Sequence, residues 1–218
     1  MHEKSDIMRP MTLIQQLDPL VHQFFAEDPS GHDIYHARRV KTLALTLCRK
    51  EGGDPKIIEI AGLVHDVFDW KFDQTHNKAV YALLEAHLSP DELNHILHIA
   101  HNISFKGAQT EKSKLSLEGQ IVQDADRLDA IGAIGIARTF AFGGHKHRPI
   151  YDPHKPPKQH QNFEEYKKSN TATINHFYEK LLLLKDRMNT KTAKIIAEKR
   201  HQYMLDFLDQ FFEEWRTT

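Results

Sequence analysis

Hydrophobic residues recur at helical spacing along nearly the whole chain, and no strand-like alternation of any length is present. Gly52-Gly53 ends one periodic stretch, and Asp54-Pro55 supplies a cap and a first-turn proline for the next. Ser89-Pro90-Asp91-Glu92 is a capping box that starts another helix. The pattern predicts an all-α fold with helices over about 10–27, 33–51, 55–69, 75–87, 90–102, 117–131, 163–188 and 190–215.

No break in composition divides the 218 residues, so we expect one domain with a core over about 10–142 and a pair of long C-terminal helices over 163–216. The only long irregular stretch is 143–162, which contains four prolines and four histidines. A loop of this length in a compact domain is usually a functional lid or a disordered segment.

Composition excludes several classes of function. The formal net charge of −1 gives no electrostatic basis for binding nucleic acid or an acidic membrane surface. No apolar run approaches the length of a membrane span, and the single cysteine, Cys48, lies in an apolar run typical of a core. We therefore expect a cytoplasmic protein. The 16 histidines are more than a core requires, and they direct attention to metal ligands.

The stretch Ala61-Gly62-Leu63-Val64-His65-Asp66-Val67-Phe68-Asp69 places an imidazole and a carboxylate in an otherwise apolar, buried helix. A buried carboxylate costs several kcal/mol unless it is paired, and no Lys or Arg lies within a turn of Asp66. Two interpretations remain open from this stretch alone. One is a divalent metal bound by His and Asp, and the other is a capped polar end of a core helix.

Two further polar residues lie in apolar helical surroundings. They are His36, before the apolar face of the second helix, and Asp126, in the sequence Val122-Gln123-Asp124-Ala125-Asp126. A lone helix histidine is more often a core residue than a ligand, and a lone helix aspartate is usually solvated. As a set with His65 and Asp66 they favour a metal site more than any one of them does.

The order His36, His65-Asp66, Asp126 resembles the H…HD…D signature of the HD-domain metal-dependent phosphohydrolases. The resemblance extends to 103–107, 123–130, 138–141 and 174–180, and it is greatest to the YpgQ-like bacterial subgroup. It implies an all-α HD helical bundle and metal ligation by His36, His65, Asp66 and Asp126. It also implies manganese-dependent hydrolysis of nucleoside triphosphates to the monophosphate and pyrophosphate. Mg²⁺, Fe²⁺, Co²⁺, Ni²⁺ and Zn²⁺ are further candidates for the ion.

Asp69 lies three residues after Asp66, on nearly the same helix face. Its position corresponds to an acidic residue that serves related ppGpp hydrolases as a general acid or base, so the resemblance implies a catalytic role for Asp69 beside Asp66. The alternative is a supporting or capping carboxylate. Trp70 replaces the second acidic residue of those hydrolases, which weakens transfer of their substrate to this chain.

Three basic residues are candidates to bind substrate phosphate: Arg39, one turn after His36; Lys106, in a glycine-containing loop; and Lys71. A structural ion pair is the alternative for Arg39. Arg127 can pair with Asp124 or Asp129 or contact substrate, and Asp129 is expected to orient a ligand histidine.

A second metal ion stays open, because His98 and His101 recur three residues apart among five histidines between 76 and 101. The alternatives are that these two histidines line the pocket or lie on the surface.

The sequence therefore predicts a phosphohydrolase of nucleotides or other phosphorylated small molecules. The leading candidate is a nucleoside triphosphate pyrophosphohydrolase. The rivals are a phosphatase of nucleoside monophosphates or of a ppGpp-type signal, and a nucleotide sensor that binds without turnover. A sensor needs no activated water, so the metal-ligand set together with Asp69 favours an enzyme. Sequence reasoning leaves the oligomeric state open.

Overall fold

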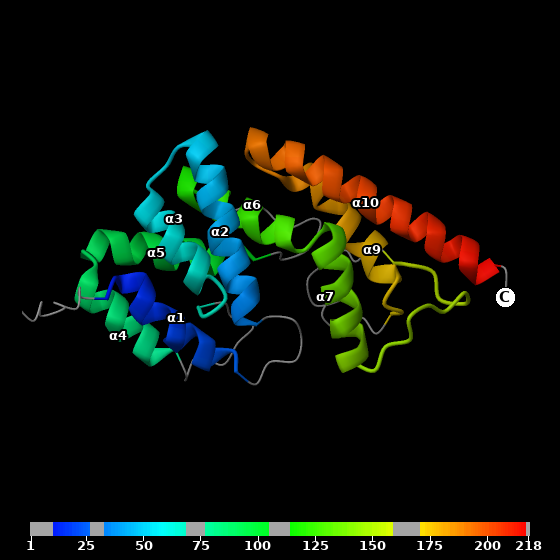
Figure 1. Ribbon diagram of the computed structural model, residues 1–218, viewed down its shortest axis with the longest axis horizontal. Coiled ribbons are helices and arrows are strands. Elements are labelled where there is room, and N and C mark those ends of the chain that lie inside the picture. The colour runs from blue at the N-terminus through cyan, green and yellow to red at the C-terminus, as the bar shows by residue number, and fades with distance from the viewer. Residues whose placement is uncertain (1–10, 27–32, 69–76, 105–113, 159–170, 217–218) are drawn as a thin grey trace, which may run out of the picture.

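The computed structural model describes residues 11–26, 33–68, 77–104, 114–158 and 171–216. Every regular element within these ranges is a helix, which confirms the all-α prediction. Helices α1 (Leu13–Phe24), α4 (Lys78–His87) and α5 (Pro90–Asn102) lie on one side of the molecule, and α7 (Gly132–His145) and α9 (Asn175–Glu179) lie on the other (Figure 1). Helices α2 (Ile34–Glu51) and α6 (Leu117–Asp129) lie between them. None of the described helices combines the length and the apolar character needed to cross a membrane.

Three borders of the N-terminal helices lie where the capping residues predict. Asp54 accepts a hydrogen bond from the Lys56 amide ahead of Pro55, and Ser89 and Glu92 form the expected capping box. Gly52, at φ 88°, ends the second helix. The bounds are α1 Leu13–Phe24, α2 Ile34–Glu51, α3 Pro55–Val64, α4 Lys78–His87 and α5 Pro90–Asn102.

The third helix is shorter than predicted. It ends at Val64, and His65 and Asp66 lie in the turn that follows. Both side chains are almost fully buried. His65 keeps helical dihedral angles, at φ −55° and ψ −42°, and its Nε2 atom lies 3.4 Å from Asp66 Oδ2.

The core is centred on α2, α3 and α6 (Leu117–Asp129). Apolar side chains from all three are fully buried, among them Val40, Leu63 and Ile121. At Gly62 the two helices α2 and α3 approach so closely that a Cβ atom would lie 3.0 Å from the Cα of Lys41. This packing brings the start of α2, the end of α3 and the end of α6 together.

Helix α7 (Gly132–His145) begins directly after α6, and Gly135 makes the tight connection possible. A Cβ atom at Gly135 would lie 2.2 Å from the carbonyl oxygen of Ala130. This contact is with backbone, which cannot move aside as a flexible side chain can.

We expect Gly135→Ala to lower the free energy of unfolding by about 2–3 kcal/mol, because overpacking outweighs the helix propensity of alanine. Gly144→Ala in the same helix is the matched control, since a Cβ there would meet nothing within 4 Å. It should be neutral or stabilising by up to about 1 kcal/mol. Urea unfolding measures both, and equal midpoints for the two variants would contradict this account of Gly135.

The irregular stretch begins later than predicted, and its described part is held in place. Helix α7 continues to His145, and the amides of Thr173 and Ile174 donate to the carbonyl oxygens of Pro149 and Ile150. The Asn175 side chain donates to the carbonyl of Lys155 at 2.7 Å. Residues 146–158 therefore form a segment fastened by these hydrogen bonds, the fastened segment, while 159–162 lie outside the described residues.

The predicted helix over 163–188 is wrong in its described part, from 171 onward. That part holds only α9 Asn175–Glu179, η2 Leu181–Leu183 and η3 Lys185–Arg187. Glu179 accepts hydrogen bonds from the Lys158 amide and the Thr171 hydroxyl, and the backbone leaves helical geometry at Lys180. Contacts with the fastened segment therefore override the helical pattern.

The predicted final helix is confirmed as α10, Lys191–Arg216. Its first turns pack on α2 and α6 and its second half packs on α7 (Figure 1). Near its end, Phe212 and Trp215 enclose Tyr151 of the fastened segment, with ring centroids 5.3 and 5.1 Å away. Tyr151 thus packs within the protein.

Candidate metal centre

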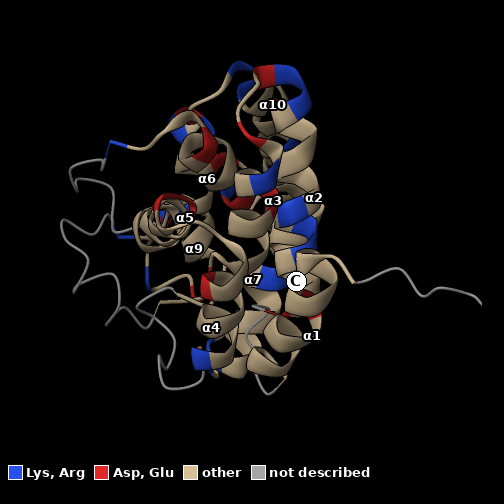
Figure 2. Cartoon of the chain, turned by 90° about the vertical axis from the view of Figure 1, so that its left-hand side faces the viewer, with Lys and Arg blue, Asp and Glu red and all other residues tan. Residues whose placement is uncertain are grey.

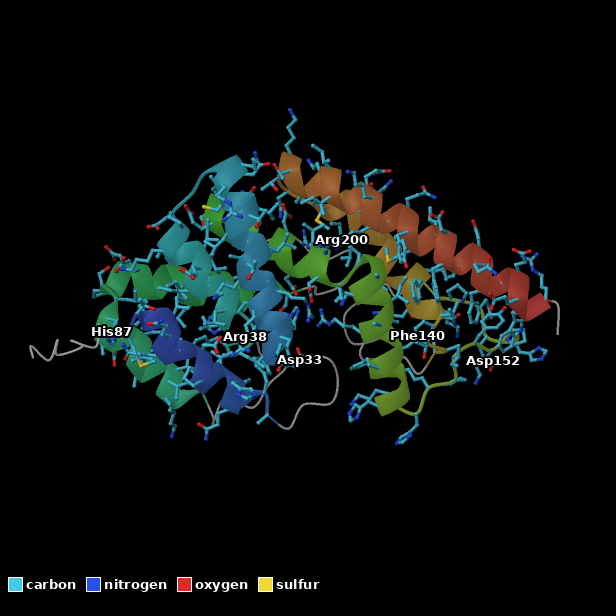
Figure 3. All side chains as sticks on the ribbon, viewed as in Figure 1. Asp33, Arg38, His87, Phe140, Asp152 and Arg200 are labelled. Carbon is cyan, nitrogen blue, oxygen red and sulfur yellow. The ribbon has the colours of Figure 1, made fainter. Side chains whose placement is uncertain are left out.

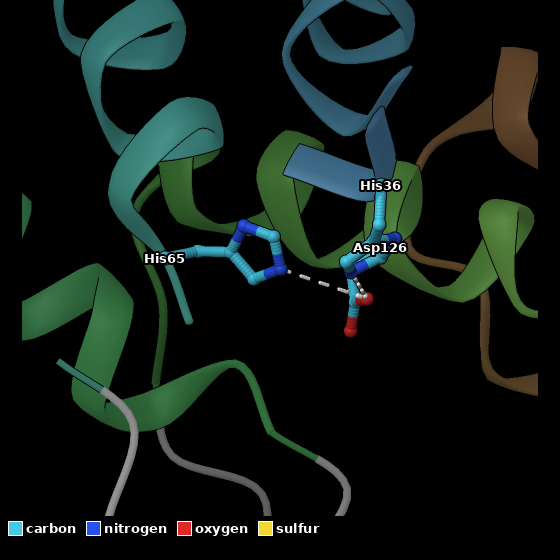
Figure 4. A group of neighbouring side chains, drawn as sticks. All are labelled: His36, His65 and Asp126. Atoms are coloured by element: carbon cyan, nitrogen blue, oxygen red, sulfur yellow. Dashed lines mark ion pairs between the residues drawn. The ribbon is translucent and has the colours of Figure 1, made fainter. Parts of the chain in front are cut away.

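Three elements bring four predicted ligands to one place. His36 comes from the first turn of α2, His65 and Asp66 from the turn after α3, and Asp126 from the last turn of α6. The side chains of His36, His65 and Asp126 point toward a common position (Figure 4).

The distances between the four side chains suit a single ion. His36 Nε2 lies 3.3 Å from Asp66 Oδ2 and 3.5 Å from Asp126 Oδ1. His65 Nε2 lies 3.4 Å from Asp66 Oδ2 and 3.8 Å from Asp126 Oδ1. Two ligand atoms that each lie about 2.1 Å from an ion, on neighbouring octahedral positions, are about 3 Å apart. Small movements of these side chains would therefore bring the ligand atoms to the distances that such an ion requires.

Hydrogen bonds fix the tautomer of both imidazoles. His65 Nδ1 lies 3.0 Å from the carbonyl oxygen of Gly62, which can only accept, so Nδ1 carries the proton. His36 Nδ1 lies 2.7 Å from Asp129 Oδ2 and donates in the same way. In the neutral form of each ring, the form that binds a metal ion, the Nε2 lone pair therefore faces the common position. The Nε2 atom of His65 is buried and makes no hydrogen bond, which is expected of a ligand atom that awaits a cation.

The charges also favour a cation. Burial opposes protonation of His65, but the carboxylates of Asp66 and Asp126 outweigh it and raise the pKa of His65 to about 9. The side chains of His36 and His65 are 1% exposed and that of Asp66 is 7% exposed, whereas that of Asp126 is 29% exposed. The group is thus a buried acidic site open on the side of Asp126.

Asp129 supports His36, as predicted. Its buried carboxylate also accepts from Arg39 Nε and Nη2 at 2.7 and 3.1 Å and from Arg138 Nη1 at 2.8 Å. Burial opposes ionisation of Asp129, but the hydrogen bonds from His36 and Arg39 prevail and hold its pKa far below the ordinary value. Asp129 therefore stays ionised and keeps His36 in the tautomer described above.

We expect Asp129→Asn to weaken Mn²⁺ binding about 10- to 100-fold, because the amide cannot hold the imidazole by charge. Isothermal titration calorimetry of the purified variant measures this. Asp18→Asn is the control, since Asp18 of α1 pairs with Arg38, which lies on the helix of His36 but is not one of the four ligands. An unchanged dissociation constant for Asp129→Asn would mean that Asp129 only balances charge.

The other candidate residues have different positions. Arg39 forms the ion pair left open by the sequence, and Arg127 donates to the backbone carbonyl of Arg187, pairing with neither Asp124 nor Asp129. His98 and His101 are exposed on α5 and belong to no group of metal-type ligands among the described residues. Asp69, Lys71 and Lys106 lie outside the described residues.

Two residues that sequence reasoning missed matter to this centre. Arg138 contacts Asp129 from α7, and Arg200 of α10 donates to the carbonyl of Leu128 at the end of α6 (Figure 3). The family resemblance over 138–141 includes Arg138 without assigning it a role, and nothing in the local sequence distinguishes Arg200 from a solvated arginine. The small residues Gly132 and Gly135 ahead of Arg138 were the available signal, because they predict close packing there.

Comparison with known proteins agrees with this geometry. The model of the HD domain matches residues 33–131. YpgQ from Bacillus subtilis is 37% identical over 208 residues, which cover 93% of this chain and 94% of YpgQ. The crystal structure of YpgQ in complex with ADP is similar at a TM-score of 0.72 and 36% identity, over 91% of this chain and 96% of that one.

Two other crystal structures are similar over nearly their whole length. A protein from Lactobacillus plantarum has a TM-score of 0.85 and 40% identity, covering 97% of this chain and 100% of that one. An HD-superfamily hydrolase from Bacillus thuringiensis has a TM-score of 0.71 and 46% identity, covering 94% and 97%.

Proposed function

The chain belongs to the HD domain family of hydrolases, and from this premise we propose that it is a metal-dependent phosphohydrolase of nucleotides. The observation that carries the proposal is the convergence of His36 Nε2, His65 Nε2, Asp66 Oδ2 and Asp126 Oδ1 at the spacing of ligands around one ion.

These four side chains would hold the divalent ion, with Mn²⁺ favoured. When bound, the ion lowers the pKa of water and stabilises negative charge on phosphoryl oxygens. Two nitrogens and two carboxylate oxygens suit a six-coordinate ion of this kind and leave positions for water and a phosphate oxygen. His36, His65 and Asp66 are buried, which limits the access of bulk water to the position.

We assign the remaining roles to four further residues. Asp69, which follows the Asp66 turn in the chain, would accept and return the proton of the attacking water. Arg39, Lys106 and Lys71 would bind the phosphate groups of the substrate by charge-assisted hydrogen bonds. Of these, Arg39 is held near His36 by Asp129.

The leading substrate is a nucleoside triphosphate, cleaved to the monophosphate and pyrophosphate. The resemblance to the YpgQ-like subgroup and the complex of YpgQ with ADP support a nucleotide. The alternatives are a phosphatase of nucleoside monophosphates or ppGpp-type signals, and a sensor without turnover.

A screen of metals against substrates, with identification of products, separates these functions. Purified protein with Mn²⁺ should release pyrophosphate from nucleoside triphosphates. Orthophosphate from monophosphates would favour the phosphatase, and binding of nucleotide without any product would favour the sensor. Absence of both binding and turnover with every metal would refute the proposal.

Asp69→Asn should keep Mn²⁺ affinity and slow turnover about 10²- to 10⁴-fold, because the amide cannot accept a proton. Calorimetry measures the affinity for Mn²⁺, and steady-state kinetics measure the turnover. Asp73→Asn, four residues later, makes the same charge change as a control. Unchanged turnover in Asp69→Asn would assign Asp69 a structural role.

A further inference from the structure

Arg200 of α10 binds the backbone at the end of α6, where α10 passes the junction of α6 and α7 (Figure 3). Its Nη1 atom donates a hydrogen bond to the carbonyl oxygen of Leu128, which also accepts from the amide of Ile131. The last carbonyl groups of a helix lack partners within the helix, and this end carries a partial negative charge. The guanidinium group therefore holds the last turn of α6 from outside that helix.

The stem of Arg200 packs against the turn between α6 and α7. Gly132 in this turn has a φ of 77°, and a Cβ atom added there would lie between 3.0 and 3.4 Å from Cβ, Cγ and Cδ of Arg200. Burial lowers the pKa of Arg200, while the charge of nearby Asp129 acts in the opposite direction. Arg200 is thus enclosed at the turn, and its side chain has little freedom to leave the end of α6.

The helix that carries Arg200 is itself anchored on α6. Thr190, immediately before α10, donates its amide and its hydroxyl group to the carboxylate of Asp124. Asp124 precedes Asp126 by two positions and Leu128 follows it by two, so contacts from α10 hold α6 on both sides of this candidate ligand. Figure 2 shows α6 and α10 toward one end of the view and α4 toward the other.

The position of Asp126 depends on the backbone of this turn. Hydrogen bonds from Nδ1 to Asp129 and to Gly62 orient the two imidazoles of His36 and His65. Within the ranges that the structure describes, no hydrogen bond orients the carboxylate of Asp126, which is 29% exposed. A metal ion tolerates displacements of its ligands of only about 0.5 Å. A small shift of the last turn of α6 would therefore move Asp126 out of reach of the ion.

We propose that Arg200 is a positioning residue of the metal centre, which holds the last turn of α6 so that Asp126 meets the ion bound by the two imidazoles. The inference rests on the proposed function and extends its metal site beyond the HD domain match, which ends at residue 131. In this role Arg200 contacts neither the ion nor the substrate, and it acts through the carbonyl group of Leu128. The C-terminal helix is then a working part of the metal centre.

The test measures Mn²⁺ affinity by isothermal titration calorimetry in the wild type, Arg200→Met and Arg200→Lys. Methionine keeps an unbranched stem beside Gly132 but cannot donate to the carbonyl of Leu128, so the affinity should fall about 3- to 30-fold. Lysine keeps a donor and the charge and should recover part of the loss. A purely electrostatic role predicts the opposite sign for Arg200→Met, because the removal of a positive charge favours a bound cation.

Val80→Ala separates positioning from a general loss of stability. Val80 is buried in α4, which packs on α1 and α5, so its truncation destabilises the fold away from α6. The urea midpoint of Val80→Ala should fall while its Mn²⁺ affinity stays at the wild-type value. The electron paramagnetic resonance spectrum of bound Mn²⁺ should change in Arg200→Met and not in Val80→Ala. If Arg200→Met is poorly folded, Arg200→Gln replaces it with the same expected direction.

The outcomes separate this inference from the proposed function. If the wild type binds Mn²⁺ and turns over nucleotides while Arg200→Met binds Mn²⁺ equally or more tightly, the positioning role is refuted and the hydrolase stands. An equal loss of affinity in Val80→Ala would refute the role as well. If Mn²⁺ binding depends on Arg200 but no nucleotide is hydrolysed, the proposed function fails and the positioning role stands. A wild type that binds no divalent ion would refute both.

Discussion

Asp66→Ala is expected to abolish Mn²⁺ binding and nucleotide turnover together. Asp66 Oδ2 lies 3.3 and 3.4 Å from the two imidazole Nε2 atoms, and it is the most buried carboxylate of the four-ligand group. Without it, only Asp126 would offset the charge of the ion. We expect the affinity for Mn²⁺ to fall more than about 100-fold.

Thermal unfolding measures the same loss without reference to activity. Mn²⁺ at 100 times its dissociation constant should stabilise the wild type by about 2.7 kcal/mol, and Asp66→Ala should show no such gain. The metal-free variant should be less stable than the metal-free wild type at neutral pH, because it loses the carboxylate that pairs with the protonated ring of His65. Asp209→Ala, at an exposed position of α10, is the control. Full turnover in Asp66→Ala would show that the site is assigned wrongly.

Asp124→Ala is expected to lower the free energy of unfolding by about 3–4 kcal/mol, through α10 and away from the metal centre. The fully buried Asp124 carboxylate accepts from the amides of Asn189 and Thr190, at 2.8 Å each, and from both of their side chains. The Thr190 hydroxyl in turn accepts from the Ala193 amide and so caps α10. Removal of the carboxylate leaves these donors buried and unpaired.

Urea unfolding of Asp124→Ala and Asp124→Asn measures the contribution. The amide keeps the shape of the side chain and one hydrogen-bond acceptor, so we expect the free energy of unfolding to fall less in Asp124→Asn than in Asp124→Ala. Asp186→Ala, exposed in η3, should stay within about 0.5 kcal/mol of the wild type. A change below 1 kcal/mol in Asp124→Ala would contradict the capping role.

The positions of most helices could be predicted from local chemistry. Asp54, Ser89 and Gly52 act within one turn of themselves, so their roles follow from the sequence alone. The convergence of His36 with His65, Asp66 and Asp126 was expected from the family resemblance, and the structure brings these four together. Their role as ligands remains a prediction.

Other features depend on contacts between distant segments. Asp124, Asp126 and Asp129 lie on one helix within six residues, yet they face α10, the metal position and two arginines, respectively. Sequence spacing predicts the direction in which each of these side chains points, but it does not predict which residues each side chain contacts. The same limit explains the wrong helix over 163–188, where Asn175 and Glu179 bind a segment about twenty residues earlier.

The cap on α10 has a consequence for how this protein can be divided. The HD domain model matches residues 33–131, a stretch that contains all four candidate ligands but ends before Asn189 and Thr190. A fragment cloned to those borders would expose Asp124 and the apolar side of α6 that α10 covers. The borders of the recognisable module and those of the stable folding unit therefore differ, and expression of the shorter piece should give an unfolded chain despite its complete set of ligands.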